Sequence, residues 1–324
     1  MTGTQPAGDA GVISPEEAFA ILGNEARTDI LLALWEAGKA RGRPRSVPFT
    51  ELFDRSGYET SSNFSYHLNQ LQARFVTKGD DGYRLTMAGL YVVRSVILAG
   101  MMTNRNTSAE LPAECPLCGS AVRMEHEGFV AKVRCTRCLG RPRSSMGRGY
   151  LLSIILSPAG VVDRSLEEAF EVGIARMIHL IDQLNRGLCY FCNGAVDATV
   201  DACVDHGGGP ETVCEACGRT VACEVLFHCI RCGGGMVVPA HLVVTTLPQV
   251  RAIRFAEDPT HDPASWSTVC RSFDIQVHPL ALDPVRLRAE VPTAGKRIVI
   301  TLDEHLEVTG GPPRAVADGG RPDG

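Results

Sequence analysis

Cysteines and one histidine recur in pairs with two residues between them, and this pairing is the main chemical signal of the sequence. Six such pairs occur between residues 115 and 232. A two-residue gap lets a tight turn aim both side chains at one ion, and thiolate and imidazole are the ligands of tetrahedral zinc. The pairs predict three structural zinc sites, whose twelve ligand positions are Cys115, Cys118, Cys135, Cys138, Cys189, Cys192, Cys203, His206, Cys214, Cys217, Cys229 and Cys232.

The first module spans residues 112–141 and contains two of the pairs. Between them lie two segments of alternating apolar and polar residues, 121–126 and 129–134, joined at Glu127-Gly128. Alternation of period two indicates strands, and a hairpin would bring the two pairs together at its base. This arrangement predicts a zinc ribbon.

The second module, residues 187–236, contains the other four pairs. Ten residues separate Cys192 from Cys203 and eleven separate Cys217 from Cys229, so these two segments, the arms of the module, are almost equal in length. If the arms pair as antiparallel strands, the outer pairs meet at the base of a long ribbon and the middle pairs meet at its tip. The alternative is an interleaved, RING-like arrangement in which the first pair joins the third. The spacing leaves both arrangements open.

Composition restricts the compartment and the partners. The chain has thirteen cysteines and no N-terminal export signal, which favours the cytoplasm, where paired cysteines bind metal more often than they form disulfides. We expect Cys223 and Cys270 to be small buried residues and His228 not to be a ligand. A net charge of −5 gives no general attraction to nucleic acid. The most apolar stretch, residues 85–102, carries Arg94 in its middle, so no membrane span is expected.

An N-terminal block, residues 14–104, has the pattern of helices around one hairpin. Ser14 followed by Pro15 is a helix start, and Asp81-Gly82 between two short apolar-polar runs is a hairpin signal. The expected helices begin at Pro15 and span 25–38, 51–57 with Thr50 as the cap, 60–75 with Phe64, Leu68, Leu71 and Phe75 inward, and 86–101. This order predicts a winged helix-turn-helix.

The segments "LGNEARTDILLAL" and "SSNFSYHLNQL" resemble the first core helix and the recognition helix of ArsR-type winged-helix regulators. The resemblance covers residues 14–104 and implies that the second of these helices enters the major groove of double-stranded DNA. The cysteine pair of some metal-sensing relatives is missing from the helix at 51–57. By match onto the helix, the implied DNA contacts are Ser61, Ser62, Asn63, Ser65, Tyr66, His67 and Gln70.

Basic side chains near this helix could contact phosphates. Lys78 and Arg84 lie on the expected wing, and Arg43 and Arg45 belong to a basic linker that could equally be a solvated loop. Residues 14–104 carry ten Lys and Arg against ten Asp and Glu, so any attraction to DNA must be local. A homodimer is expected by analogy, because two half-sites give the affinity that one small helix lacks.

The remaining segments complete an α+β chain: the winged helix-turn-helix, zinc-ribbon modules and a small strand-rich C-terminal region. A helical connector at 163–186 begins with a capping box formed by Ser165 and Glu168. Residues 237–309 are expected to be strand-rich, with strands around Thr293-Ala294-Gly295 and Asp303-Glu304. Residues 1–13 and 310–324 are expected to be disordered, because they are rich in Gly, Pro and small polar residues.

The cysteine-rich part is similar to the extensions of predicted ArsR-like winged-helix regulators from archaea, particularly halophiles, in "CNGAVDATVDACVDHGG" and "CEACGR". The function that follows is a DNA-binding transcriptional regulator. A RING-like protein-interaction module and a redox-responsive zinc switch are the alternatives. An enzyme fits poorly, because four Cys or His ligands leave no open zinc position. The operator, a protein partner and a small effector stay unknown.

Overall fold

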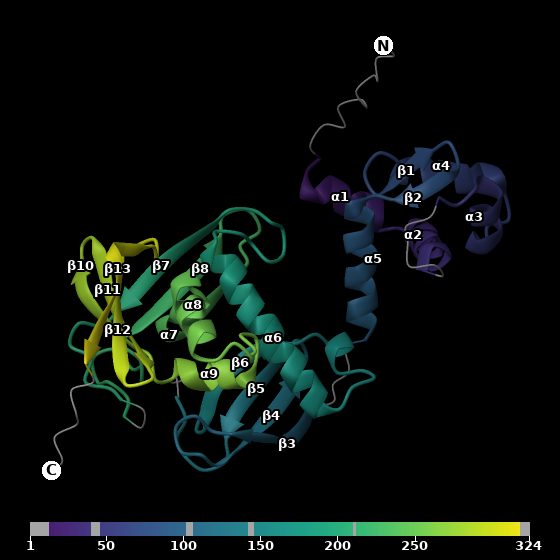
Figure 1. The fold of residues 1–324 in the computed structure, drawn as a ribbon. Helices are drawn as coiled ribbons and strands as arrows, with labels where there is room; N and C mark the ends of the chain where they lie inside the picture. Colours follow the sequence, from purple (N-terminus) through teal and green to yellow (C-terminus); the bar gives the residue numbers. More distant parts are fainter. Residues whose placement is uncertain (1–12, 40–45, 102–105, 142–145, 210–211, 318–324) are drawn as a thin grey trace. The chain divides into compact units, whose positions relative to one another are not determined.

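The computed structural model describes residues 13–39, 46–101, 106–141, 146–209 and 212–317 (Figure 1). The chain divides into two compact units, residues 1–102 and 103–324. The first unit is built mainly of helices and the second mainly of antiparallel sheets. The mixed α+β class expected from the sequence is therefore confirmed.

The N-terminal unit has seven elements in its described part. The helices are α1 (Pro15–Leu22), α2 (Glu25–Lys39), α3 (Phe49–Ser56), α4 (Ser61–Leu71) and α5 (Met87–Gly100), and the strands are β1 (Val76–Gly79) and β2 (Gly82–Leu85). The expected start of α1 is confirmed by a capping box. The Ser14 hydroxyl accepts from the Glu17 N–H at 3.2 Å, and the Glu17 carboxylate accepts from the Ser14 N–H at 2.9 Å.

Phe64 of α4 is fully buried at the centre of this unit. The rings of Phe49, Phe53 and Tyr58 lie around it, with centroids 5.2, 5.5 and 5.4 Å from its own. The expected cap at Thr50 is wrong: α3 begins two residues earlier than expected, at Phe49, with Pro48 at the N-cap. The reason is that Phe49 must lie on the helix to reach Phe64.

Helix α4 is shorter than the sequence predicts. Phe64, Leu68 and Leu71 are buried as expected, but the helix ends at Leu71 because Ala73 has φ +66°, a left-handed conformation that stops a helix. Phe75 is buried outside the helix.

The hairpin turn also differs from the expectation by one residue. Gly79 pairs with Gly82, so the turn residues are Asp80 and Asp81. Gly82 has φ +125°, and a Cβ there would lie 2.3 Å from the Val47 carbonyl oxygen. The glycine is required because Val47 exchanges two backbone hydrogen bonds with Tyr83, at 2.7 and 2.9 Å, along the edge of the hairpin.

The C-terminal unit contains three antiparallel sheets among its described residues, with the orders β3-β4-β5-β6, β7-β8-β9 and β10-β11-β12-β13. The strands are β3 (Thr107–Glu114), β4 (Ala121–Glu127), β5 (Val130–Cys135), β6 (Tyr150–Ile155), β7 (Val196–Ala202), β8 (Cys223–Cys229), β9 (Gly235–Pro239), β10 (Gln276–Leu282), β11 (Val285–Thr293), β12 (Lys296–Leu302) and β13 (Val308–Ala317). The helices are α6 (Leu166–Asn185), α7 (Ala240–Thr246), α8 (Pro248–Glu257) and α9 (Trp266–Ser272), with a short 3₁₀ turn at Pro158–Gly160.

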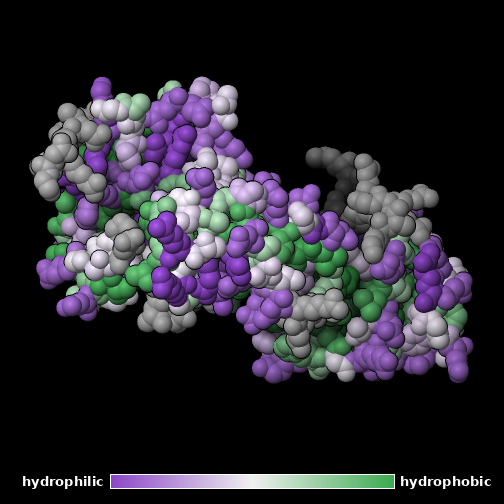
Figure 2. All heavy atoms as spheres, turned by 90° about the horizontal axis from the view of Figure 1, so that it is seen from below, coloured by the Kyte–Doolittle hydropathy of each residue, from purple (hydrophilic) through white to green (hydrophobic). Residues whose placement is uncertain are grey.

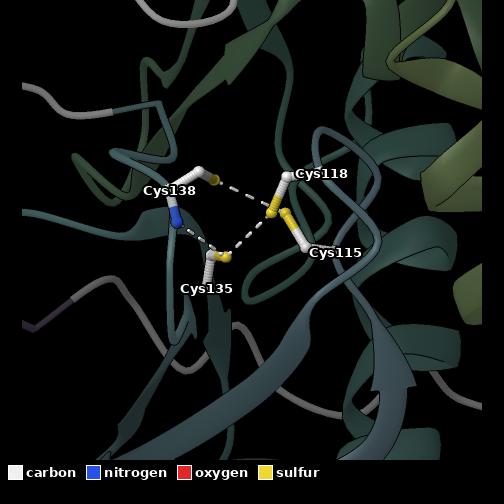
Figure 3. Close-up of side chains that lie close together, drawn as sticks. All are labelled: Cys115, Cys118, Cys135 and Cys138. Carbon is white, nitrogen blue, oxygen red and sulfur yellow. Dashed lines mark hydrogen bonds between the residues drawn. The ribbon is translucent and has the colours of Figure 1, made fainter.

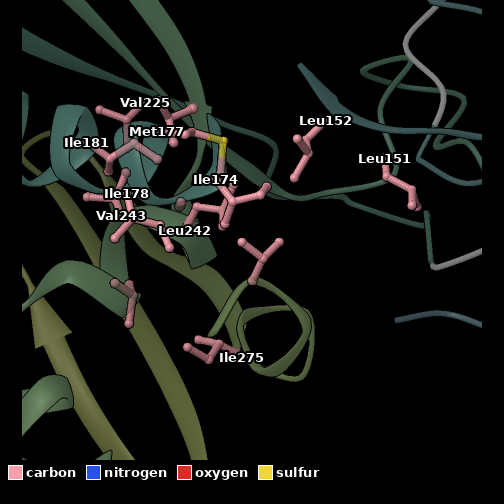
Figure 4. Close-up of a cluster of buried hydrophobic side chains, with 14 of the residues drawn as sticks. Leu151, Leu152, Ile174, Met177, Ile178, Ile181, Val225, Leu242, Val243 and Ile275 are labelled. Atoms are coloured by element: carbon pink, nitrogen blue, oxygen red, sulfur yellow. The ribbon is translucent and has the colours of Figure 1, made fainter. Parts of the chain in front are cut away.

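Helix α6, expected as a connector, is the central helix of the C-terminal core. Its start is confirmed by the capping box of Ser165 and Glu168. Ile174, Met177 and Ile178 point into a cluster with side chains of β6, β8 and α7 (Figure 4). A Cβ at Gly173 would lie 2.9 Å from the Ile154 side chain, so the glycine allows the helix to approach the sheet closely.

The expectation of a strand-rich segment at 237–309 is only partly right. The three strands about 293–295 and 303–304 are present as β11, β12 and β13, but residues 240–272 form three helices. Helix α7 has the sequence "AHLVVTT", whose β-branched residues favour strands. Six of its seven residues are buried, and this packing outweighs the local preference.

Part of the C-terminal segment expected to be disordered is a strand. Residues 310–317 belong to β13, which pairs with β12 at the edge of its sheet. Pro312 and Pro313 fall at the register shift of this pairing, between Thr309 and Arg314, where neither has a partner on β12, and such irregularities at an edge strand are where sheets tolerate proline. Residues 1–12 and 318–324, also expected to be disordered, lie outside the described part of the chain.

None of the helices that the structure describes combines the length and the apolar run that a bilayer crossing needs. On the face drawn in Figure 2, hydrophilic and hydrophobic residues are interspersed.

Candidate metal centres

Twelve ligand positions gather into three groups, each with four ligand atoms within 4.8 Å of one another. The first group is Cys115, Cys118, Cys135 and Cys138. The base group is Cys189, Cys192, Cys229 and Cys232, and the tip group is Cys203, His206, Cys214 and Cys217. The groups are those expected for a long ribbon with a site at each end. The interleaved alternative is therefore wrong.

The distances inside the groups match a tetrahedral ion. In the first group the Sγ atoms of Cys118 and Cys135 lie 3.5 Å apart, and those of Cys115 and Cys138 lie 3.7 Å apart (Figure 3). A tetrahedral zinc about 2.3 Å from each sulfur would place the sulfurs about 3.8 Å apart, whereas a disulfide bond is about 2.05 Å long. The first group is thus arranged for a metal ion and is compatible with zinc.

The base group repeats this geometry. The Sγ atoms of Cys192 and Cys229 lie 3.5 Å apart and those of Cys189 and Cys232 lie 3.7 Å apart. In the tip group Nδ1 of His206 lies 3.5 Å from Sγ of Cys217. A zinc with one sulfur and one nitrogen ligand would place these two atoms about 3.5 Å apart. Nδ1 is therefore the nitrogen of His206 that faces the thiols.

Strand register decides which pairs meet. In the first group Val122 of β4 pairs with Cys135 of β5, so the two cysteine pairs lie at one end of a hairpin. In the second ribbon Val196 of β7 pairs with Cys229 of β8, and Ala202 pairs with Cys223 at the other end. The base group lies before the first of these strand pairs and the tip group lies beyond the last.

Four of the five Cys-x-x-Cys turns share one backbone conformation. The residue after the second cysteine is left-handed in each, and its N–H donates to the carbonyl of the first cysteine at 2.8–3.0 Å. These residues are Gly119, Asn193, Gly218 and Gly233, with φ of +69°, +59°, +68° and +71°. Glycine and asparagine tolerate this conformation best, so the turn is encoded locally. The turn at Cys135 and Cys138 differs, because its left-handed residue is Gly140, two positions on.

Hydrogen bonds to sulfur prepare the thiols for a cation. In the first group, hydrogen bonds from Ser120 lower the pKa of Cys118 to about 6, whereas burial raises the pKa of Cys115 to about 11. In the base group, the backbone N–H groups of Cys232 and Arg231 lower the pKa of Cys229 to about 6. The backbone N–H of Cys192 also lowers the pKa of Cys189 in the base group, and thiols whose pKa is lowered in this way release their protons more easily when a metal binds.

An arginine balances charge beside the tip group. Arg219 follows Cys217 closely and forms ion pairs with Asp201 at 2.6 Å and with Glu224 at 3.6 Å. A zinc ion with three thiolates and one neutral imidazole carries one net negative charge, which a neighbouring guanidinium stabilises. Gly208 closes the group from the other side, where a Cβ would lie 2.8 Å from Nε2 of His206.

The two cysteines expected not to be ligands lie outside all three groups. Cys223 is buried within β8, and burial raises its pKa to about 12. Cys270 is half-buried on α9, and burial raises its pKa to about 11. His228 is exposed on β8 and belongs to no group.

The candidate DNA contacts on α4 form an outward face opposite its buried residues. Ser61, Ser62, Asn63, Tyr66 and Gln70 are exposed, Ser65 and His67 are half-buried, and Lys78 and Arg84 are exposed on the hairpin. His67 lies between the rings of Tyr58 and Tyr66, with centroid distances of 5.8 and 5.2 Å. Arg43 and Arg45 lie outside the described residues.

Two protein-family models match the chain. Residues 15–96 match the family described as domain of unknown function DUF7347, and residues 112–308 match domain of unknown function DUF7351. The second match covers more than half of the chain. The chain belongs to the DUF7351 family. No curated protein and no solved structure matches it. The two matches fall on the two structural units, and the DUF7351 region contains every ligand position of the three groups.

Two strands of the DUF7351 region were missed by sequence reasoning. Strands β3 and β6 flank the first hairpin and extend it to a four-stranded sheet. The run "YLLSII" at Tyr150–Ile155 is a short apolar stretch of the kind that a buried strand shows, and this signal could have identified β6. β3 has no comparable apolar run.

Proposed function

We propose that the chain is a DNA-binding transcriptional regulator whose N-terminal unit is a winged helix-turn-helix and whose C-terminal unit is built around three zinc ions. The observation that supports this best is the division of α4 into two faces. Phe64, Leu68 and Leu71 are buried, while a row of polar side chains faces solvent beside the β1–β2 hairpin. A polar helix held against a small core, with a hairpin next to it, has the form needed to enter a major groove.

The exposed side chains of α4 suit base contacts. Asn63 and Gln70 have amides that both donate and accept, and a bidentate amide is the usual reader of adenine. Ser62 and Tyr66 offer hydroxyls to bases or phosphates, and Tyr66 is 58% exposed. Helix α4 itself carries no Lys, Arg, Asp or Glu, so base contacts on this face require no desolvation of a charged side chain.

Phosphate contacts would come from the strands of the hairpin. Lys78 and Arg84 are exposed, and Nζ of Lys78 lies 5.7 Å from the centroid of the Tyr83 ring. Asp80 and Asp81 at the turn repel phosphates, so the tip of the wing is a poor contact point. Among the described residues, the expected electrostatic contribution of the hairpin therefore comes from Lys78 and Arg84, and Arg43 and Arg45 stay candidates outside them.

The zinc ions have a structural role in this proposal. Cysteine thiolates in a tetrahedral arrangement select zinc over the hard cations that prefer oxygen. Four protein ligands close each site and leave no position for a substrate. The ions would tie together the ends of two hairpins.

A dimer would supply the second half-site. Helix α5 exposes three large apolar side chains, Met87, Tyr91 and Val96, with 60, 47 and 45% of their surfaces accessible. Exposed apolar residues along one helix are suited to pairing with a second copy. Light scattering on the purified chain measures this directly, and a Tyr91→Glu variant is expected to shift a dimer toward monomer.

The DNA-binding proposal is tested by fluorescence anisotropy on a library of genomic fragments, with salt varied from about 50 to 200 mM. We expect selective binding that weakens with salt. Asn63→Ala and Gln70→Ala should reduce selectivity by about 1–3 kcal/mol each at single base pairs. The double variant Lys78→Gln with Arg84→Gln should reduce the salt slope by about two for all sequences.

Arg164→Gln is the matched control, because Arg164 is exposed in the other unit and its change removes the same kind of charge. Binding that is absent from every fragment, or unaltered in the α4 variants, would contradict the proposal. A chain with three zinc ions and no DNA affinity would favour a protein-interaction module instead.

A further inference from the structure

A charged side chain lies in the interior of the C-terminal unit. Nη1 of Arg141 lies 2.9 Å from Nε2 and 3.2 Å from Nδ1 of His241, to which it donates a hydrogen bond. The guanidinium carbon is 4.1 Å from the centroid of the Phe273 ring. The Nε–H group is buried and has no acceptor among the described residues. A buried donor left in this way costs free energy.

The charge of Arg141 has no carboxylate partner in direct contact within the described chain. Burial lowers the pKa of Arg141 to about 10, so the side chain is still protonated at neutral pH. Burial also lowers the pKa of His241 far below its usual range, so this neighbour is neutral. Asp274 acts on Arg141 through its charge but forms no ion pair with it. Arg219, by contrast, has two carboxylates within reach.

Arg141 lines a cavity of the size that holds small molecules. The cavity has a volume of about 660 Å³, and its wall also includes His241, Phe273, the carboxylate of Asp274 and the polar side chains of Gln276 and His278 on β10. A second arginine of the wall, Arg297, forms an ion pair with Glu290 at 3.6 Å. A smaller, mainly apolar cavity of about 180 Å³ shares Arg141, His241 and Phe273. The guanidinium therefore lies where a polar and an apolar space meet.

The backbone fixes Arg141 in this position. Arg141 follows Cys138 of the first metal group by three residues, and its N–H donates to the Tyr150 carbonyl of β6 at 2.5 Å. Gly140, at φ +68°, allows this approach, because a Cβ there would lie 2.3 Å from the same carbonyl oxygen. The side chain is thus presented from a backbone position that is hydrogen-bonded to β6, which reduces the cost of ordering it on binding.

We propose that this cavity binds a small oxyanion, a carboxylate or a phosphate group, with Arg141 as its anchor. The guanidinium presents a planar fork of donors that matches the oxygens of either group, and the Phe273 ring holds the plane of the fork. Gln276 and His278, which line the same cavity, supply further hydrogen bonds. The site lies within the DUF7351 region and does not depend on the proposed DNA binding.

Isothermal titration calorimetry on the metal-loaded, full-length chain tests the proposal. Sodium succinate and sodium phosphate are titrated separately, with chloride used to hold the ionic strength constant. We expect saturable binding of at least one of the two, and the stronger of them tells whether the site takes a carboxylate or a phosphate. Saturation by neither anion would overturn the proposal.

Arg141→Gln should weaken the binding at least tenfold, whereas Arg148→Gln should leave it unchanged, because exposed Arg148 lines neither cavity. Equal anion affinities of the wild type and the Arg141→Gln variant would show that Arg141 does not hold the anion. Gln276→Glu provides a second test that does not disturb the buried arginine, since Gln276 is exposed on β10. Its added negative charge should also weaken binding at least tenfold, and unchanged affinity there would count against the site even if Arg141→Gln failed to fold.

Discussion

The Sγ atoms of Cys192 and Cys229 lie 3.5 Å apart, although the two strands of a hairpin and a complete second ligand group separate them in the chain. Seven strand pairs, from Val196 with Cys229 to Ala202 with Cys223, run between the base and tip groups. At about 3.3 Å per residue these pairs hold the two groups roughly 20 Å apart. The base and tip groups are therefore separate sites with no shared ligand.

The separation predicts the metal content of double variants. Cys189→Ala combined with Cys229→Ala removes two ligands of the base group and should leave two of three zinc ions. Cys192→Ala combined with Cys217→Ala damages both groups of the ribbon and should leave one. Elemental analysis of the purified chains measures the content. Cys270→Ala is the control and should retain all three. One zinc ion in the first double variant and two in the second would instead support the interleaved pairing.

The conformation of Gly82 predicts a difference in stability between two glycine variants of the N-terminal unit. Gly82→Ala should lower the free energy of unfolding by about 2 kcal/mol or more, because its left-handed φ and the Val47 carbonyl both oppose a side chain. Gly79→Ala is the matched control in the same hairpin, where a Cβ meets no atom closer than 3.9 Å. Urea denaturation followed by circular dichroism compares them. Equal losses in the two variants would show that the Val47–Tyr83 pairing does not constrain the turn.

Because Phe64 is buried, truncating its side chain is expected to lower the stability of the N-terminal unit strongly. Phe64→Ala should lower the free energy of unfolding by about 3–5 kcal/mol, since it leaves a cavity between three aromatic rings. Phe19→Ala, at a position that is 74% exposed on α1, should change stability by less than about 0.5 kcal/mol. The same denaturation experiment measures both. A small effect at Phe64 would mean that the aromatic cluster is not the core of this unit.

His241 predicts how stability depends on pH. Burial holds its pKa well below the usual value, so below about pH 6.5 the unfolded chain binds a proton that the folded chain does not. Stability should therefore fall as the pH falls, with a contribution from His241 of about 1 kcal/mol between pH 7.5 and 5.5.

The His241→Gln variant should lose that part of the pH dependence, while the variant of exposed His305, His305→Gln, should keep it. Chemical denaturation at the two pH values, with metal content checked at each, gives the comparison. A pH dependence identical in wild type and His241→Gln would mean that His241 is protonated in the folded chain.

Local signals accounted for much of the fold and for the metal groups. The capping boxes at Ser14 and Ser165 act within one helical turn, and the alternation in β11 and β12 is a property of each strand. The left-handed glycines after the cysteine pairs act within a single turn as well. Each of these features depends on residues close together in the chain, and so each could be found by inspecting a short segment.

Features decided by packing were missed or misplaced. Helix α7 carries strand-forming residues but is helical because nearly all of it is buried. The cap of α3 moved to Pro48 because Phe49 packs against Phe64, and α6 is a core helix rather than a connector. In each case the residues that pack on the helix lie outside it in the sequence, so the periodicity of the helix itself does not indicate them.

The sequence by itself determined the twelve candidate ligand positions, because each pair is set by a two-residue gap and a tight turn. Only the tertiary structure decided that pairs meet at the base and tip of one ribbon, since the strand register selects them. It also decided that Arg141 meets His241, 100 residues further along the chain. That contact arises where α7 packs beside the turn leading into β6, and no local pattern of residues encodes it.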